Sequence, residues 1–212
     1  MTIVITGGSG FIGGQISKRL LSDGKTVIVV DIVPPAFTHE NLFFIKCDIT
    51  ESPLPYGILE KTDAVINLAG RTIFGKWTPA IKEQIRKSRI DSTKHIVESI
   101  ASAASKPSCF ICASAIGFYG DTGEEIADEQ FHKGQGFLAD VVSDWESEAQ
   151  RASEYGVRVV CVRTAPVLGH GGMLAELRKT AKFGFLMKLK KQDFWMSWIH
   201  EDDIVNTYLF AL

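Results

Sequence analysis

The 212-residue sequence lacks several features that would place it in a specialised class of protein. No apolar run approaches the ~18 residues needed to cross a bilayer, and the amino terminus has no basic stretch followed by an apolar one, so neither a membrane span nor a signal peptide is expected. The formal net charge is only −2, which gives no reason to expect nucleic acid or an anionic membrane as a partner. Together with 45% hydrophobic and 23% charged residues, these absences predict a cytoplasmic globular protein.

Cysteine is also scarce, and its positions argue against metal or disulfide chemistry. The four cysteines, Cys47, Cys109, Cys112 and Cys161, lie within or at the ends of apolar runs. Cys109 and Cys112 form a C-x-x-C pattern, but residues three apart on a strand point to opposite faces. We therefore predict four reduced, buried cysteines, and no metal site.

The sequence does contain a glycine-rich turn near its amino terminus. The β-branched run 2–6 is typical of a buried strand, and the apolar spacing of 11–22 is helical. Between them, Gly8-Ser9-Gly10-Phe11-Ile12-Gly13 fits the pattern G-x-G-x-x-G, in which the glycines allow a tight turn, the close approach of a pyrophosphate and the packing of helix on strand. The amides at the start of the helix then face the phosphates. A plain strand-to-helix turn is the alternative for the same residues.

An aspartate follows the second apolar run, at a sequence spacing from the glycine-rich turn that is typical of dinucleotide-binding folds. The run 26–30 ends in Asp31, at about the spacing expected of the carboxylate that accepts hydrogen bonds from the adenosine ribose. Because that carboxylate would repel a 2′-phosphate and no arginine follows it directly, the sequence favours NAD over NADP as the cofactor. The alternative is that Asp31 only closes the strand as a turn former.

Three more apolar runs end in residues that belong at the same edge of the predicted sheet. Asp48 follows the third run, where it either accepts a hydrogen bond from the adenine amine or caps a following helix. Ala69 and Gly70 follow the fourth, and their small size either lets a cofactor lie close to the backbone or makes a tight turn. Ser114 follows the fifth. Ligands bind outside the carboxyl ends of such strands, so we expect these residues to lie close together.

The alternation of strands and helices predicts an α/β protein with a doubly wound, Rossmann-like parallel sheet. The expected strands are 2–6, 26–30, 42–47, 64–68, 108–112 and 158–163, and the expected helices are 11–22, 79–104, 137–155 and 201–212. We assign residues 1–165 to a dinucleotide-binding domain and 166–212 to a small C-terminal substrate lobe, too short for an independent core. Both a truncated lobe and a naturally short one fit this length.

Motifs spanning nearly the whole chain carry a family resemblance. They are 6–13, Asp31, Asp48-Ile49, 67–70, Tyr119-Gly120, Val162-Arg163, Leu168-Gly169 and 199–203. In this order they resemble the extended short-chain dehydrogenase/reductase family, in its NAD-dependent epimerase/dehydratase branch. The longer strings 114–123, 137–139 with 144–146, and 195–200 are similar to the atypical epimerase-family proteins of that group.

The motifs and the resemblance together imply a set of cofactor contacts. They are Gly7, Gly10, Phe11, Ile12, Gly13, Asp31, Ile32, Asp48, Ile49, Leu68, Ala69, Gly70, Gln84 and Arg89. Arg89 replaces an asparagine of the family and is expected to reach the cofactor, with Gln84 about one and a half turns earlier on the same helix. The alternative for both is a solvated helix face.

The sequence departs from the family where the reaction is catalysed. Members that catalyse use a tyrosine and a lysine four residues apart, the phenol as acid/base and the ammonium to lower its pKa. Here these positions hold Phe137 and Val141, and neither can transfer a proton. The serine or threonine that such members place four residues before the tyrosine of the Tyr-Gly pair falls on Ala115 here. Ser114 and Tyr119 remain as catalytic candidates, with a small residue beside the cofactor and a hydrogen-bonded packing residue as the alternatives.

The carboxyl-terminal segment adds three residues with two interpretations each. His200 is either catalytic or a structural histidine before an acidic helix start. Trp195 and Trp198 belong either to the core or to a pocket wall.

The resulting hypothesis is an NAD(P)-binding oxidoreductase or epimerase of the extended short-chain type. It would act by hydride transfer on a small-molecule substrate, which the resemblance implies to be nucleotide-sugar-like. The alternative is a catalytically silent dinucleotide-binding sensor or interaction protein, which the missing Tyr/Lys pair favours. No nucleic acid, membrane or metal is expected as a partner, and a homodimer is one expected assembly.

Overall fold

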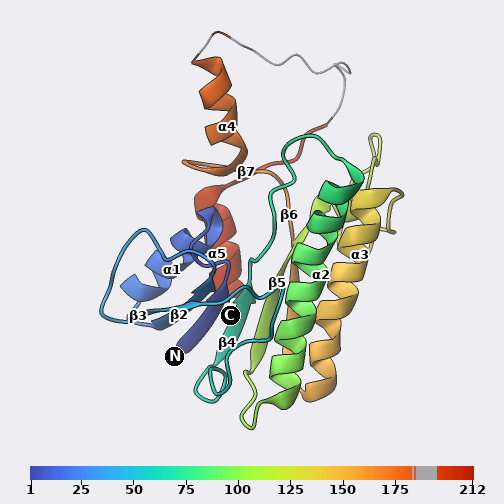
Figure 1. The fold of residues 1–212 in the computed structure, drawn as a ribbon. Coiled ribbons are helices and arrows are strands. Elements are labelled where there is room, and N and C mark those ends of the chain that lie inside the picture. The colour runs from blue at the N-terminus through green and yellow to red at the C-terminus, as the bar shows by residue number, and fades with distance from the viewer. Residues whose placement is uncertain (183, 185–194) are drawn as a thin grey trace.

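A six-stranded parallel sheet lies at the centre of the computed structural model, which describes residues 1–182, 184 and 195–212 (Figure 1). The strands follow the order β3-β2-β1-β4-β5-β6, and every pair is parallel. Their bounds are β1 (Thr2–Thr6), β2 (Thr26–Asp31), β3 (Leu42–Lys46), β4 (Ala64–Asn67), β5 (Cys109–Ala115) and β6 (Arg158–Thr164). The order reverses between β1 and β4, which is where a ligand-binding crevice opens in sheets of this kind.

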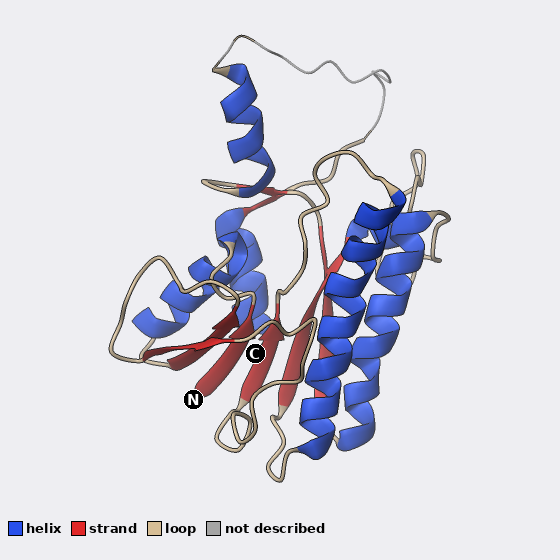
Figure 2. Ribbon diagram, in the orientation of Figure 1, coloured by secondary structure: helices blue, strands red, loops and turns tan. Residues whose placement is uncertain are grey.

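Helices cover both faces of this sheet (Figure 2). The helices α1 (Phe11–Ser22) and α5 (Glu201–Ala211) pack on one face, and α2 (Pro79–Ser102) and α3 (Phe137–Gln150) pack on the other. Two 3-10 turns, η1 (Ile116–Phe118) and η2 (Arg151–Tyr155), follow β5 and α3. A short parallel pair, β7 (Val167–Leu168) and β8 (Ile199–His200), stands beside α4 (Gly172–Ala181).

The apolar residues of β1 explain why this strand is central. Ile3 and Ile5 are buried in the cluster that includes α1 and α5, whereas Val4 points to the opposite face and packs with α2 and α3 residues. A parallel strand covered on both faces needs such a continuous apolar run. The predicted fold class is therefore confirmed.

Two predicted boundaries differ from the structure by more than two residues. The fifth strand extends to Ala115, so Ser114 lies within β5 and pairs with Arg163 of β6, and does not start a loop. The predicted helix 137–155 is α-helical only as far as Gln150.

α5 shares the core of α1, although it belongs to the segment assigned to a separate lobe. The division at residue 165 stays a prediction.

The cysteines confirm the expected geometry only in part. Cys109 packs with the α1 and α5 cluster and Cys112 with the opposite one, so the C-x-x-C pair does face both sides of the sheet. All four thiols are free. The prediction that all are buried was wrong for Cys47 and Cys161, which are half-buried because they follow or lie on the edge strands β3 and β6.

Candidate functional site

The glycine-rich turn connects β1 to α1 at the carboxyl edge of the sheet. Gly7 has a φ of +71°, in the left-handed region, so this residue makes the tight turn, one position before the first glycine of the motif. A Cβ on Gly7 would lie 2.7 Å from the carbonyl carbon of Leu68, and one on Gly13 would lie 2.5 Å from the Gly7 oxygen. These two glycines are required because the turn packs tightly on β4 and on itself.

Gly10 differs from the other two. A Cβ there would meet only the Gly7 oxygen, at 3.1 Å, and its backbone is extended. The Gly10 amide donates to Gly7, and α1 begins at the next residue. Gly10 is thus needed less for internal packing than for what approaches the turn from outside, as expected for the glycine beside a pyrophosphate.

Asp31 joins the glycine-rich turn to the end of β2. Its Oδ2 accepts a hydrogen bond from the Ser9 amide at 3.0 Å, and its Oδ1 accepts one from the Ile32 amide at 2.7 Å. The Ser9 hydroxyl donates to the Val33 carbonyl at 2.7 Å. The carboxylate therefore has a turn-forming role, and it occupies the strand end from which a ribose would be bound. Its contact with ribose stays a prediction.

Asp48 forms a turn of its own. Its Oδ1 accepts hydrogen bonds from the Thr50 amide at 3.0 Å and the Thr50 hydroxyl at 2.6 Å. Because residues 49–51 form a turn and no helix starts there, the alternative of a helix N-cap was wrong. The adenine contact stays a prediction. The side chain of Ile49 is buried in the core, and its carbonyl oxygen is hydrogen-bonded to the ring of His95 at 2.8 Å.

The other predicted cofactor residues lie in different surroundings. Ile32 is exposed beside Asp31, Gln84 is exposed on α2, and Ile12 and Leu68 pack against the core. The structure brings Gly70 and Arg89 together, since a Cβ on Gly70 would lie 3.7 Å from the guanidinium carbon of Arg89.

A buried polar network anchors the end of β4. Asn67 accepts from the Thr6 hydroxyl at 2.7 Å and donates to the Thr93 hydroxyl at 2.9 Å, which also accepts from the indole of Trp145 at 2.8 Å. These contacts tie β1, β4, α2 and α3 together beneath the crevice. Sequence reasoning missed Thr93, which no motif marks.

Ser114 and Tyr119 meet through two residues that sequence reasoning did not single out. The Ser114 hydroxyl donates to Oε1 of Glu146 at 2.5 Å. Arg163 binds both carboxylate oxygens of Glu146 at 2.8 Å and donates to the Tyr119 hydroxyl at 3.0 Å. Its guanidinium also stacks on Phe118, 3.6 Å from the ring centroid. We call Ser114, Glu146, Arg163 and Tyr119 the β5–β6 network.

The ion pair of this network is largely buried. The Glu146 and Arg163 side chains are 13% and 20% exposed. The hydrogen bond to Glu146 raises the pKa of Arg163 further above its ordinary value, so the guanidinium stays charged. Both residues lie within motif strings of the sequence, but their contact depends on the pairing of β5 with β6 beneath α3.

The positions of the missing Tyr/Lys pair are filled by apolar packing. Val141 is buried, and Phe137 packs edge-on against Trp77 with ring centroids 5.6 Å apart. The ammonium of Lys82 lies 5.2 Å from the Phe137 ring centroid. Neither Phe137 nor Val141 therefore offers a group that could exchange a proton with a ligand.

The loop after β7 covers the start of α1. A Cβ on Gly171 would lie 2.5 Å from the Phe11 ring, so the loop passes directly over this residue of the motif. Glu201, buried at the start of α5, accepts hydrogen bonds from the amide and ring Nδ1 of His170. Burial alone raises the pKa of Glu201, but the hydrogen bonds from His170 outweigh it and hold that pKa below its ordinary value.

The structure also places the three C-terminal candidate residues. His200 accepts a hydrogen bond from the Asp202 amide at 3.2 Å and caps α5, which is the structural role considered for it. Trp195 and Trp198 are 83% and 60% exposed, so the interpretation of these residues as core was wrong.

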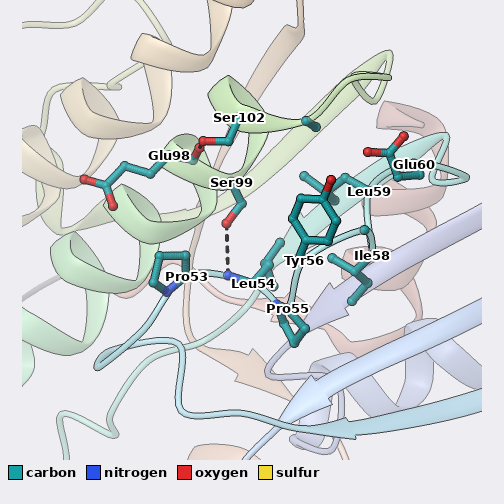
Figure 3. Close-up of a pocket in the computed structure, with 12 residues that line it drawn as sticks. Pro53, Leu54, Pro55, Tyr56, Ile58, Leu59, Glu60, Glu98, Ser99 and Ser102 are labelled. Atoms are coloured by element: carbon teal, nitrogen blue, oxygen red, sulfur yellow. Dashed lines mark hydrogen bonds between the residues drawn. The ribbon is translucent and has the colours of Figure 1, made fainter.

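Two hollows differ in their relation to this site. A cavity of about 450 Å³ lies between residues 53–60 and the last turns of α2, away from the carboxyl edge of the sheet, where the Ser99 hydroxyl accepts from the Leu54 amide at 2.9 Å (Figure 3). A hollow of about 140 Å³ lies beside the glycine-rich turn and includes Ser9, Gly10 and Lys18. The larger hollow is thus unrelated to the strand ends that carry the predicted site.

Two classes of site are not found in the described part of the chain. It contains no group of three or more histidine, cysteine, aspartate and glutamate side chains that could hold a metal ion. No helix within residues 1–182 and 195–212 is long and apolar enough to span a membrane.

A parallel sheet whose order reverses beside a glycine-rich strand-to-helix turn defines the Rossmann-like dinucleotide-binding class. Comparison with known proteins gives the particular family. The chain belongs to the NAD dependent epimerase/dehydratase family, whose model matches residues 3–212.

Curated relatives agree with this assignment. The chain is 34% identical to the chloroplastic epimerase family protein SDR39U1 homolog of Arabidopsis thaliana and 32% identical to the epimerase family protein YfhF of Bacillus subtilis. The whole chain is aligned in both cases, and it spans 62% and 70% of these two relatives.

Solved structures have the same fold. Human epimerase family protein SDR39U1 with NADPH matches with a TM-score of 0.83 and 25% identity, over all of this chain and 70% of that one. A nucleoside-diphosphate sugar epimerase from Corynebacterium glutamicum matches with a TM-score of 0.78 and 32% identity, over all of this chain and 43% of that one. The predicted family and a nicotinamide dinucleotide as the cofactor class are thus confirmed, and the choice between NAD and NADP stays a prediction.

Proposed function

We propose that the chain is an NAD(P)-dependent oxidoreductase or epimerase of the extended short-chain type that acts on a nucleotide-sugar-like substrate. The observation that carries this proposal is the glycine-rich turn, where a Cβ on Gly10 would come no closer than 3.1 Å to another atom, whereas one on Gly8 or Gly13 would lie within 2.8 Å. Asp31 flanks the turn on one side, and the backbone of Leu68 and Ala69 flanks it on the other. The substrate class is supported by the name of the Corynebacterium neighbour. In this proposal residues 1–165 bind the dinucleotide and 166–212 form the substrate side.

The cofactor, when bound, supplies the hydride chemistry, and the protein orients it and handles the proton. Arg163 donates to the oxygen of Tyr119, so the O–H of that phenol points elsewhere and can serve a substrate hydroxyl. Ser114 donates its own proton to Glu146, which leaves its oxygen to accept a hydrogen bond. We therefore assign proton transfer to Tyr119 and substrate positioning to Ser114.

Calorimetric titration of the purified chain with NAD, NADH, NADP and NADPH tests the first half of this proposal. Binding of one pair, with NAD favoured because of Asp31, is the expected result. Turnover of UDP-glucose and UDP-glucuronic acid is then measured with Tyr119→Phe and with Tyr155→Phe as a control outside the network. Turnover that is lost only in Tyr119→Phe supports the assignment, and the absence of any dinucleotide binding overturns the whole proposal.

A second candidate is a dinucleotide-binding protein without turnover. The apolar packing of Phe137 and Val141 favours it, because these are the positions of the acid/base pair in catalytic relatives. The same experiments separate the two functions. Tight binding without turnover of any nucleotide sugar, and no effect of Tyr119→Phe, would favour the silent protein.

A further inference from the structure

The short parallel pair β7–β8 brings the loop 169–172 beside the first residue of α5. Leu168 pairs with His200, so the residues that follow them, Gly169 and Glu201, leave the two strands side by side. A Cβ on Gly169 would collide with the carboxylate of Glu201, so a glycine is needed to leave room for that side chain. The strand pairing therefore packs the loop directly against the carboxylate.

Glu201 binds this loop at two points. One carboxylate oxygen accepts a hydrogen bond from the His170 amide at 2.9 Å, and the other is hydrogen-bonded to the His170 ring. The Glu201 side chain is only 8% exposed, whereas that of His170 is 87% exposed, so the carboxylate is the fixed partner. α5 holds it in place, because Ile204 and Tyr208 of this helix are buried in the core shared with α1. The loop is thus fastened to a rigid element of the fold.

Further along, the loop closes over Phe11, the first residue of α1. A Cβ on Gly171 would lie 2.5 Å from one side of the Phe11 ring, and one on Gly172 would lie 3.3 Å from the other side. Phe11 also packs against the core, so its ring is held between the core and the loop. The first amides of an α-helix have no partner within the helix, and in the proposed binding mode those of α1 face the pyrophosphate. The loop therefore helps to set where these amides lie.

We propose that Glu201 is a positioning residue for dinucleotide binding, because it fastens the loop 169–172 over Phe11 and so fixes the start of α1. Glu201 acts through the loop and the ring, and it does not itself contact the ligand. The segment assigned to the substrate side would in this way also control the affinity for the cofactor. The inference rests on the proposed function for its ligand, since that function places a dinucleotide at the glycine-rich turn.

Glu201→Ala tests the proposal, with Asp202→Ala as the matched control. Asp202 is the next residue in the same first turn of α5, and its side chain is 82% exposed. Calorimetry with NADH and NADPH should show affinity about 10-fold weaker in Glu201→Ala and a change of less than about twofold in Asp202→Ala. Glu201→Gln keeps an oxygen that can accept from the His170 amide and should recover most of the affinity. Equal affinities in Glu201→Ala and Asp202→Ala would overturn the proposal.

A double-mutant cycle tests whether the effect passes through Phe11. Phe11→Leu keeps an apolar side chain under the loop but removes the ring that Gly171 and Gly172 enclose. Because both changes loosen the same contact, the double variant with Glu201→Ala should bind the dinucleotide no more than about twofold more weakly than the weaker single variant. Losses of affinity that multiply would show that Glu201 does not act through Phe11, and the proposal would fail.

Hydrogen exchange without ligand separates this proposal from the proposed function. The amides of Gly10 and Gly14 donate to the carbonyls of Gly7 and Gly10, so their protection reports the order of the turn. Glu201→Ala should speed exchange in the loop and at these two amides and leave β5 unchanged. Faster exchange in the loop alone, or an equal increase in β5, would overturn the positioning role. If the wild type binds no dinucleotide but shows the expected exchange pattern, the link from Glu201 to the turn stands and the proposed function fails.

Discussion

Replacing Glu146 by alanine should destabilise the protein more than the loss of a surface ion pair would. The change removes both carboxylate oxygens that Arg163 binds at 2.8 Å and the acceptor of the Ser114 hydroxyl. Opposite charges about 4 Å apart interact by ~4 kcal/mol at an effective dielectric constant of 20. Loss of one partner of a buried pair costs about 3–5 kcal/mol. Because Arg163 is 20% exposed and water can reach it in part, we expect a loss of about 3 kcal/mol.

Thermal unfolding by circular dichroism measures this loss. For a chain of this length, each kcal/mol corresponds to roughly 2–4 °C, so the melting temperature should decrease by about 6–12 °C. Asp144 lies on the same helix as Glu146, and Asp144→Ala, which breaks the exposed pair with Arg86 of α2, should cost less than about 1 kcal/mol.

A double-mutant cycle shows whether the ion pair is responsible for this loss. Arg163→Met keeps an apolar chain over Phe118 and removes the charge. The loss of unfolding free energy in the double variant with Glu146→Ala should therefore be smaller than the sum of the two single losses by about 2 kcal/mol. Additive losses, or a loss for Glu146→Ala no larger than that for Asp144→Ala, would refute the energetic argument for the β5–β6 network.

Three further predictions concern the site and its surroundings. Gly10→Val should keep the fold and weaken dinucleotide binding roughly 100-fold or more, as calorimetry measures. Gly13→Val should unfold the chain, because its Cβ would lie 2.5 Å from a backbone oxygen. Far-UV circular dichroism that shows both variants equally folded would contradict this difference. Asp31→Ala should narrow any preference for NAD over NADP, and an unchanged ratio of the two dissociation constants would leave Asp31 only its turn-forming role. The lowered pKa of Glu201 contributes stability that is present above the ordinary carboxyl pKa and is lost as the pH falls through the lowered value, so the free energy of unfolding, measured by urea titration, should decrease less between pH 7 and 3 in Glu201→Gln than in the wild type; parallel curves for both proteins would contradict this.

The sequence predicted the sheet well because the information is local. Runs of β-branched residues predict strands such as β1 wherever they occur, and a glycine turn followed by a helical period marks the start of α1 without knowledge of the rest of the chain. Phe137 and Val141 could also be judged from sequence, because side-chain type alone decides whether a proton can be transferred.

The site was predicted less completely because its contacts join distant segments. Ser114 and Tyr119 were chosen as candidates, but Glu146 and Arg163 were not, although they bind both. Nothing in local spacing shows that Glu146 of α3 lies over the register pair Ser114 and Arg163 of two parallel strands.

By itself, the sequence determined the order of strands and helices, the position of the glycine-rich turn and the absence of a Tyr/Lys pair. These depend on backbone preferences and on side-chain chemistry, which act over a few residues. Only the tertiary structure decided which charges are neutralised: Arg163 of β6 binds a carboxylate, whereas Arg89 of α2 has none in the described part of the chain. The reason is physical, since the cost of a charge depends on its burial and on its neighbours in space, and the register of the strands and the packing of the helices set both.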